Sequence, residues 1–273
     1  MSGPGALTVY RWELRKLRSQ KRTYLGLGFA MAMPLLFVVA TAIRNHGPED
    51  VPFGRYVLQS GLAVPLVLLT FGAYWLFPLI TALVAGDIVA SEDHNGTLKT
   101  ILTRSLDRGP IFAGKVLAAC TYALGALVAM AVVALVAGGI QSGFHPLTTL
   151  SGTTVHPGHG LVLILASFVV YLFPMIGVAA LGLLLSTVAR NSAAAVVGTL
   201  LISLVLQLVA ILPGLGGIKP YLLPNQFFAW HGFLREPTDW APIGHAAWVC
   251  GIWTAVALAA GYLVFLRRDV AGG

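Results

Sequence analysis

Six long apolar runs alternate with shorter polar segments along this chain of 273 residues. A helix needs about 20 apolar residues to cross a bilayer, and its backbone polar groups must be satisfied within the segment. The runs cover about 24–43, 62–85, 111–140, 161–189, 193–212 and 242–266. The pattern predicts an all-α integral membrane protein, with a six-helix bundle forming a single transmembrane domain over residues 1–273.

Composition supports a lipid-facing surface. Hydrophobic residues make up 57% of the chain and charged residues 10%, whereas soluble domains carry about 25% charged residues. The net charge is +7, but the basic residues lie beside the apolar runs. That position favours membrane lipid with anionic headgroups as a partner and gives no reason to expect nucleic acid.

The distribution of Lys and Arg predicts the orientation. With the N-terminus inside, 13 of these residues fall in inner segments and 4 in outer segments. We therefore expect a multi-pass plasma-membrane protein with both termini in the cytoplasm. A cleaved signal peptide ending near Ala40-Thr41-Ala42 is the alternative for the first run, although that run and the basic segment before it are long for a signal peptide.

The segment 5–22, before the first run, is amphipathic. One helical stripe is mainly apolar and consists of Leu7, Tyr10, Leu14 and Leu17. A second stripe is basic and consists of Arg11, Arg15, Arg18 and Arg22. This pattern predicts an elbow helix in the inner membrane interface that braces the bundle. A plain basic flank without a further role is the alternative.

The loop 86–110 is the long inner connection. Its acidic residues come first and its basic residues follow, with a turn signal at Asn95-Gly96. Leu98, Ile101 and Leu102 then form a short apolar face. A small amphipathic helix of this kind offers a docking surface for a partner protein. A solvated connector is the alternative.

The same loop resembles the signature loop of type-2 ABC export permeases, a family similar to the ABCG-type transporters. The matching residues are Glu92, Gly96-Thr97-Leu98, Arg108 and Gly114-Lys115. Glu13 followed by Leu14-Arg15-Lys16-Leu17 resembles the elbow of that family, and Ser186 through Ser192 resembles its short second inner loop. Ser105-Leu106 departs from the family, which usually carries a proline there.

The resemblance implies a coupling helix over 92–102 that sits on an ABC ATPase subunit, which would bind ATP and Mg. It also implies a second permease, either another copy of this chain or a paralogue. The implied coupling residues are Glu92, Gly96, Thr97, Leu98, Ile101, Leu102, Arg104 and Arg108. The implied elbow residues are Arg11, Glu13, Leu14, Arg15 and Leu17.

Motifs for chemistry within the chain itself are weak. Residues 109–116 nearly form a P-loop, but Val116 stands where Ser or Thr would hold magnesium. His145, His156 and His159 lie in a Pro- and Gly-containing outer loop, without a nearby carboxylate or Cys to complete a zinc site. We therefore expect no enzymatic activity, cofactor or metal in this chain.

A substrate path is expected along the second and fifth runs. Phe71, Tyr74 and Trp75 fall at i, i+3 and i+4 and are expected to share a helix face. Ser203 and Gln207 lie one turn apart on the fifth run. An aromatic wall with one amide suits an amphipathic, weakly polar substrate. Helix packing or lipid contact is the alternative. Residues 213–230 are expected to form either re-entrant outer helices or an interfacial aromatic belt.

Together these patterns predict the transmembrane permease subunit of an ATP-binding-cassette transporter. It would export an amphipathic or hydrophobic compound, such as a drug, an antibiotic or a lipid-like molecule, while a separate subunit hydrolyses ATP. A non-transporting membrane scaffold or regulatory protein is the alternative.

Overall fold

A computed structural model describes residues 5–94, 107–189 and 191–267. Within these residues the chain forms six apolar helical spans. Each span is long and apolar enough to cross a membrane, which confirms the predicted helical bundle. Five spans are single helices: α2 (Lys21–Arg44), α7 (Arg108–Ser142), α8 (Pro157–Val188), α9 (Ser192–Ile211) and α11 (Ala241–Arg267). The second is divided into α3 (Ala63–Phe71), η2 (Gly72–Leu76) and α4 (Phe77–Ala85).

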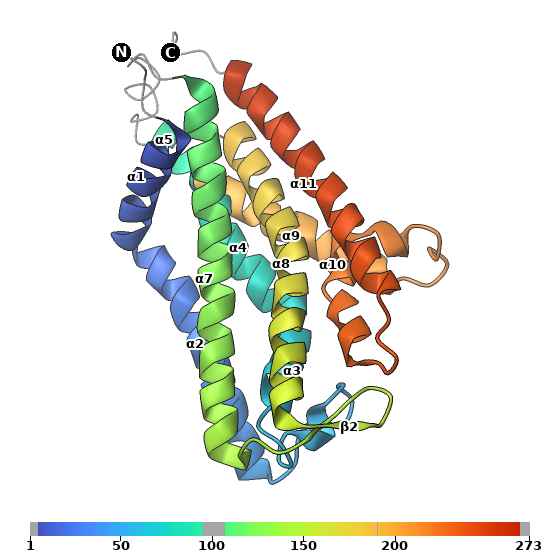
Figure 1. The fold of residues 1–273 in the computed structure, drawn as a ribbon. Coiled ribbons are helices and arrows are strands. Elements are labelled where there is room, and N and C mark those ends of the chain that lie inside the picture. Colours follow the sequence, from blue (N-terminus) through green and yellow to red (C-terminus); the bar gives the residue numbers. More distant parts are fainter. Residues whose placement is uncertain (1–4, 95–106, 190, 268–273) are drawn as a thin grey trace.

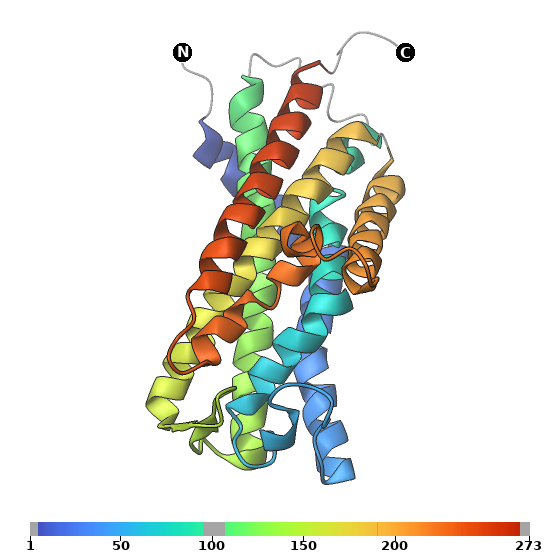
Figure 2. The ribbon, with the colours of Figure 1, turned by 90° about the vertical axis from the view of Figure 1, so that its right-hand side faces the viewer.

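The long helices α7 and α8 run through the centre of the bundle (Figure 1). α2 and the N-terminal helix α1 (Ala6–Arg18) pack on α7, and α11 packs along α8. Figures 1 and 2 show the start of α1 and the end of α11 at the same end of the bundle, which we call the elbow end. The opposite end carries the strands β1 (Leu147–Thr148) and β2 (Thr154–Val155), and we call it the hairpin end.

Small residues let the spans approach closely. A Cβ added at Gly61 would lie 2.2 Å from the backbone oxygen of Gly138, so the start of the second span packs directly against the backbone of α7. A Cβ at Gly182 on α8 would lie 2.9 Å from the Cβ of Ala85 on α4. Lipid offers no hydrophobic drive to bring helices together, so such small residues favour association by permitting close van der Waals contact.

The segment η2 is a π-helical turn within the second span. The backbone N–H of Phe77 donates to the carbonyl of Gly72, five residues earlier. Pro78 follows at once and has no N–H to give to the preceding turn, and its ring needs extra room there. The wider π turn provides this room.

The connection between α9 and α11 is built from short elements and aromatic rings. Between α9 and α11 the chain forms η3 (Lys219–Tyr221), α10 (Leu223–Gln226) and η4 (Ala229–Leu234). These pieces lie beside α8 part-way along the bundle (Figure 2). The Trp230 side chain on η4 is fully buried, and its ring centroid lies 6.2 Å from that of Phe53, which precedes η1 (Gly54–Tyr56). The backbone N–H of Leu150 donates to the carbonyl of Leu234 at 2.8 Å and joins the hairpin to η4.

Candidate coupling site and substrate pocket

Helix α1 presents one face to the bundle and another to its surroundings. Val9, Glu13 and Leu17 are buried against α7, and a Cβ at Gly114 on α7 would lie 2.7 Å from a Val9 methyl carbon. Tyr10 and Leu14, also expected on the apolar stripe, are half-buried beside them, whereas Leu7 is exposed. Most of the apolar stripe therefore contacts protein, and the buried face beside it carries a carboxylate, Glu13, into that contact.

Lys115 on α7 meets this carboxylate inside the protein. Its side chain is 1% exposed, and its Nζ lies 2.7 Å from Glu13 Oε1 and 2.7 Å from Glu92 Oε2. Nζ also donates to the carbonyl of Ile88 at 3.1 Å, so the ammonium group faces two carboxylates and one backbone carbonyl. Glu92 lies on α5 (Ala90–His94), and its Oε1 lies 2.6 Å from Lys16 Nζ on α1. These four side chains form what we call the lysine cluster: Glu13, Lys16, Glu92 and Lys115.

The cluster balances two carboxylates with two ammonium groups. Taking charged groups out of water costs several kcal/mol per ion, and close pairing with hydrogen bonds offsets this cost. The charge balance depends on α1, α5 and α7 keeping their relative positions, because removing one partner leaves a buried charge without compensation. The cluster thus ties α1, α5 and α7 together in one arrangement.

A second polar contact lies close by, at Asp87. Its side chain is buried and accepts from Arg22 at the start of α2 and from the hydroxyl of Ser192 at the start of α9. A Cβ at Gly86 would lie 2.9 Å from the Cα of Val196, so the end of the second span also packs tightly on α9. We call Arg22, Asp87 and Ser192 the aspartate node.

Ser186 on α8 completes the inner connections. Its hydroxyl oxygen accepts from the backbone N–H groups of Val89 and Ala90, at 3.0 and 2.9 Å. These N–H groups open α5 and have no partner within that helix, so Ser186 satisfies them. The short helix α5 is therefore fixed to α1 and α7 by charge, to α8 by a hydroxyl and to α9 through the preceding residues.

The other expected coupling residues lie on both sides of a gap in the described chain. Arg108, at the start of α7, donates from Nη1 to the carbonyls of Phe265 (3.3 Å) and Leu266. It thereby caps the C-terminal end of α11, where a positive charge is favourable. The remaining expected coupling residues fall outside the described residues: Gly96, Thr97, Leu98, Ile101, Leu102 and Arg104.

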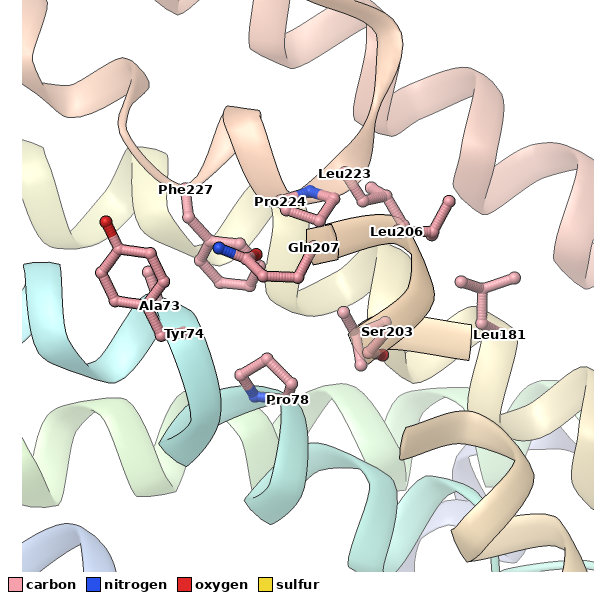
Figure 3. A pocket seen from close by; sticks show the side chains of 11 residues that line it. Ala73, Tyr74, Pro78, Leu181, Ser203, Leu206, Gln207, Leu223, Pro224 and Phe227 are labelled. Carbon is pink, nitrogen blue, oxygen red and sulfur yellow. The ribbon is translucent and has the colours of Figure 1, made fainter. Parts of the chain in front are cut away.

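A pocket lies at membrane depth between the second span, α8, α9 and α10. Tyr74, Ser203 and Gln207 contribute its polar groups, and Phe227 and Pro78 contribute apolar walls. Figure 3 shows the Gln207 amide extending from α9 toward Phe227 and Tyr74. The Ser203 hydroxyl donates to the carbonyl of Thr199 at 2.9 Å. The open space is about 10 Å³, room for about one water molecule, so the pocket is closed in this conformation.

The expected shared face of Phe71, Tyr74 and Trp75 is wrong. Phe71 and Trp75 line a different cavity, an apolar groove of about 620 Å³ against α2, whereas Tyr74 lines the pocket with Ser203 and Gln207. The expectation assumed an α-helix throughout. The π turn η2 has more residues per turn, so it rotates Tyr74 away from the side that holds Phe71 and Trp75.

Sequence reasoning did not give a site role to Lys16, Asp87 or Lys115. Two signals pointed to them. Glu13 shares a helix face with Val9 and Leu17, and a carboxylate on a buried face requires a cation. Lys115 lies inside an apolar run, where ionisable residues usually pair with one another. Within the described parts of the chain, no three His, Cys, Asp or Glu side chains gather where they could hold a metal ion.

These features define a multi-pass helical membrane protein with buried charges at one end and a weakly polar pocket between its spans. Residues 10–209 match the family described as ABC-2 family transporter protein. The match covers most of the chain, which therefore belongs to the ABC-2 family of transporter proteins. The chain is accordingly a permease of an ABC transporter, and permeases of this family work with an ATP-binding subunit. A comparison with curated proteins found no match.

Proposed function

We propose that this chain is the permease subunit of an ATP-driven exporter, and that a separate ATPase subunit docks on the loop 86–110. The ATPase binds ATP and Mg. Both termini and this loop face the cytoplasm, consistent with the excess of Lys and Arg in the inner segments. A second permease, either a copy of this chain or a paralogue, completes the transporter.

The observation that carries this proposal is the attachment of α5. This helix is only five residues long, yet buried polar contacts join it and the residues just before it to α1, α2, α7, α8 and α9. A solvated connector would not need buried ion pairs, because exposed pairs contribute little stability. A helix that receives force from a docked ATPase does need firm attachments to the spans.

Movement of α5 would reach the pocket through the aspartate node. Most residues of α9 are exposed or half-buried, and its buried residues are Ala195 and Thr199. Its elbow end is held by Asp87, while its other half carries Ser203 and Gln207 into the pocket. A tilt of α9 would therefore open the pocket without disrupting a large packed surface.

The pocket suits an amphipathic or hydrophobic compound, such as a drug, an antibiotic or a lipid-like molecule. Its side chains offer an amide, two hydroxyl groups and apolar walls, and none of the described residues that line it is charged. An amide can give and accept hydrogen bonds, so it can bind a neutral polar group of the cargo. The apolar walls bind the rest of the molecule by burying its surface.

The test is to purify the chain with its ATPase subunit and change Asp87→Asn. We expect the ATPase to remain bound and to hydrolyse ATP at its basal rate, while stimulation by transported compounds falls at least about tenfold. Asp239→Asn, at the other end of the bundle, is the matched control and should retain stimulation. Full stimulation and transport in Asp87→Asn, or failure of the chain to bind any ATPase, would overturn the proposal.

A further inference from the structure

The outward face of α1 carries a compact group of arginines. Arg11, Arg15 and Arg18 are all exposed, and at 100° per residue they fall within about 60° of one another around the helix. Among the residues that the structure describes, none of the three forms an ion pair. Leu7 and Trp12, which are 58% and 48% exposed, flank them on the same face.

The opposite face of α1 is fixed to the bundle. Glu13 pairs with Lys115, and the Tyr10 hydroxyl lies 2.8 Å from Thr121 Oγ1 on α7. Arg22, which the sequence pattern placed on the same basic stripe, turns away to Asp87. Because the buried face fixes the orientation of α1 on the bundle, the three remaining arginines point away from the other helices.

The position of α1 along the bundle corresponds to the membrane surface. It packs on the first part of α7, near the elbow end (Figure 1). α7 has 35 residues and is about 50 Å long, longer than the hydrocarbon core of about 30 Å. Its first turns, with α1 beside them, therefore extend into the layer of lipid headgroups.

We propose that the arginine face, defined as Leu7, Arg11, Trp12, Arg15 and Arg18, binds anionic phospholipids. The guanidinium groups bind lipid phosphates with paired hydrogen bonds. Leu7 and Trp12 enter the boundary between headgroups and acyl chains, where Trp is favoured. Leu7 and Trp12, the exposed apolar residues beside the arginines, favour a lipid surface as the partner. An acidic protein surface would bind the arginines without needing these apolar residues.

Lipid binding on this face has a consequence for transport. The same helix holds Glu13 in the lysine cluster, so lipids that fix the orientation of α1 also stabilise its ion pairs with α7 and α5. Stimulation of ATP hydrolysis should therefore depend on anionic lipid. This consequence rests on the proposed function, whereas binding of the lipid does not.

The direct test measures lipid retained by the purified full-length chain in native mass spectrometry, after equilibration with equal amounts of phosphatidylglycerol and phosphatidylcholine. The variant is the triple change Arg11→Gln, Arg15→Gln and Arg18→Gln. We expect it to lose the preference for phosphatidylglycerol by on the order of tenfold. The triple change Arg44→Gln, Arg55→Gln and Arg235→Gln removes the same charge elsewhere and should keep the preference. The triple Arg→Lys change on α1 should keep most of it.

Each outcome decides the question. Equal preference for phosphatidylglycerol in the α1 variant and the wild type would overturn the proposal, as would an equal loss in the control variant. If the α1 variant keeps its lipids but no longer binds the ATPase subunit, the arginine face is a protein-docking surface and the proposal fails. The lipid readout needs no transport activity, so failure of the proposed exporter function would leave it interpretable.

Discussion

The two ends of this bundle are held together by different interactions. At the elbow end, Lys115 and Glu92 are buried in the lysine cluster with ion pairs of 2.6 to 2.7 Å. At the hairpin end, a contact between rings is prominent: the buried Trp230 side chain packs against Phe53, with ring centroids 6.2 Å apart. Rings also pack at the elbow end, where Phe112 lies against Phe265, but all of the buried charged residues in the described chain lie at the elbow end.

Under the proposed function, the elbow end is the end that responds to the ATPase and the hairpin end is the end that stays fixed. A buried ion pair is stable only while both of its partners stay in contact. Displacing one helix therefore makes the original arrangement of the helices unfavourable and favours a different arrangement. Aromatic packing is less selective, because any close contact that excludes lipid or water contributes. If force from the ATPase enters at the elbow end, as proposed, buried charge lies at the end that receives the force and ring packing stabilises the opposite end.

The largest expected effect comes from removing the central cation of the elbow end. Lys115→Met leaves Glu13 and Glu92 buried without their shared partner. We expect a loss of about 3–5 kcal/mol in the free energy of unfolding, as for other broken buried pairs. Thermal unfolding of the purified chain in detergent measures it.

The control for this prediction removes the charges together. The triple change Glu13→Gln, Glu92→Gln and Lys115→Met should recover most of the lost stability, because Lys16 is partly exposed and keeps its solvation. It should not recover stimulation of the ATPase, since the connection to α5 is gone. A single Lys115→Met variant as stable as the wild type would show that the cluster does not hold the elbow end.

The next effect concerns the hairpin end and acts through pH. Burial, with a smaller contribution from the charge of Arg235, lowers the pKa of His231 from 6.5 to about 4. Between these values the unfolded chain binds a proton that the folded chain does not, so stability falls as the pH drops from 6.5 toward 4. The difference of about 2.5 units in pKa gives a loss of at most about 3.5 kcal/mol in the free energy of unfolding.

Variants at two histidines check this assignment. His231→Gln should flatten the pH dependence of thermal unfolding between pH 6.5 and 4.5, whereas His159→Gln, on the exposed start of α8, should leave it unchanged. If both variants lose stability in acid as the wild type does, the hairpin end is not the source of the acid sensitivity.

The bundle was predictable from the sequence because lipid imposes one strong requirement. Each span must satisfy its backbone groups internally and expose apolar side chains, so six apolar runs predicted six helices. The amphipathic segment before the first span was equally visible, because Leu14 and Leu17 recur at helical spacing. Only local regularity was needed for these predictions.

The site was predictable in part, because it depends on contacts between distant residues. Glu13 and Glu92 came from the resemblance to a family, but nothing local shows that both meet Lys115, 102 residues after Glu13. The π turn at η2 also escaped the pattern, although Pro78 is a residue type that distorts helices. A constant α-helical period predicts the wrong face of the second span for Tyr74, because the single π turn changes the direction of this side chain.

The smallest expected effect is at Gln207, and it sharpens the contrast with Lys115. The Gln207 amide is half-buried and hydrogen-bonds to none of the described residues. Gln207→Ala should therefore change stability by less than about 0.5 kcal/mol. If the amide binds the cargo, losing one hydrogen bond costs about 0.5–1.5 kcal/mol, which raises the compound concentration for half-maximal ATPase stimulation about two- to tenfold.

Val205→Ala, 200° away around α9 by helical geometry, should leave this concentration unchanged. Equal behaviour of the two variants would remove the pocket from the transport path while leaving the elbow end's role intact, because the lysine cluster stands on contacts that neither change touches.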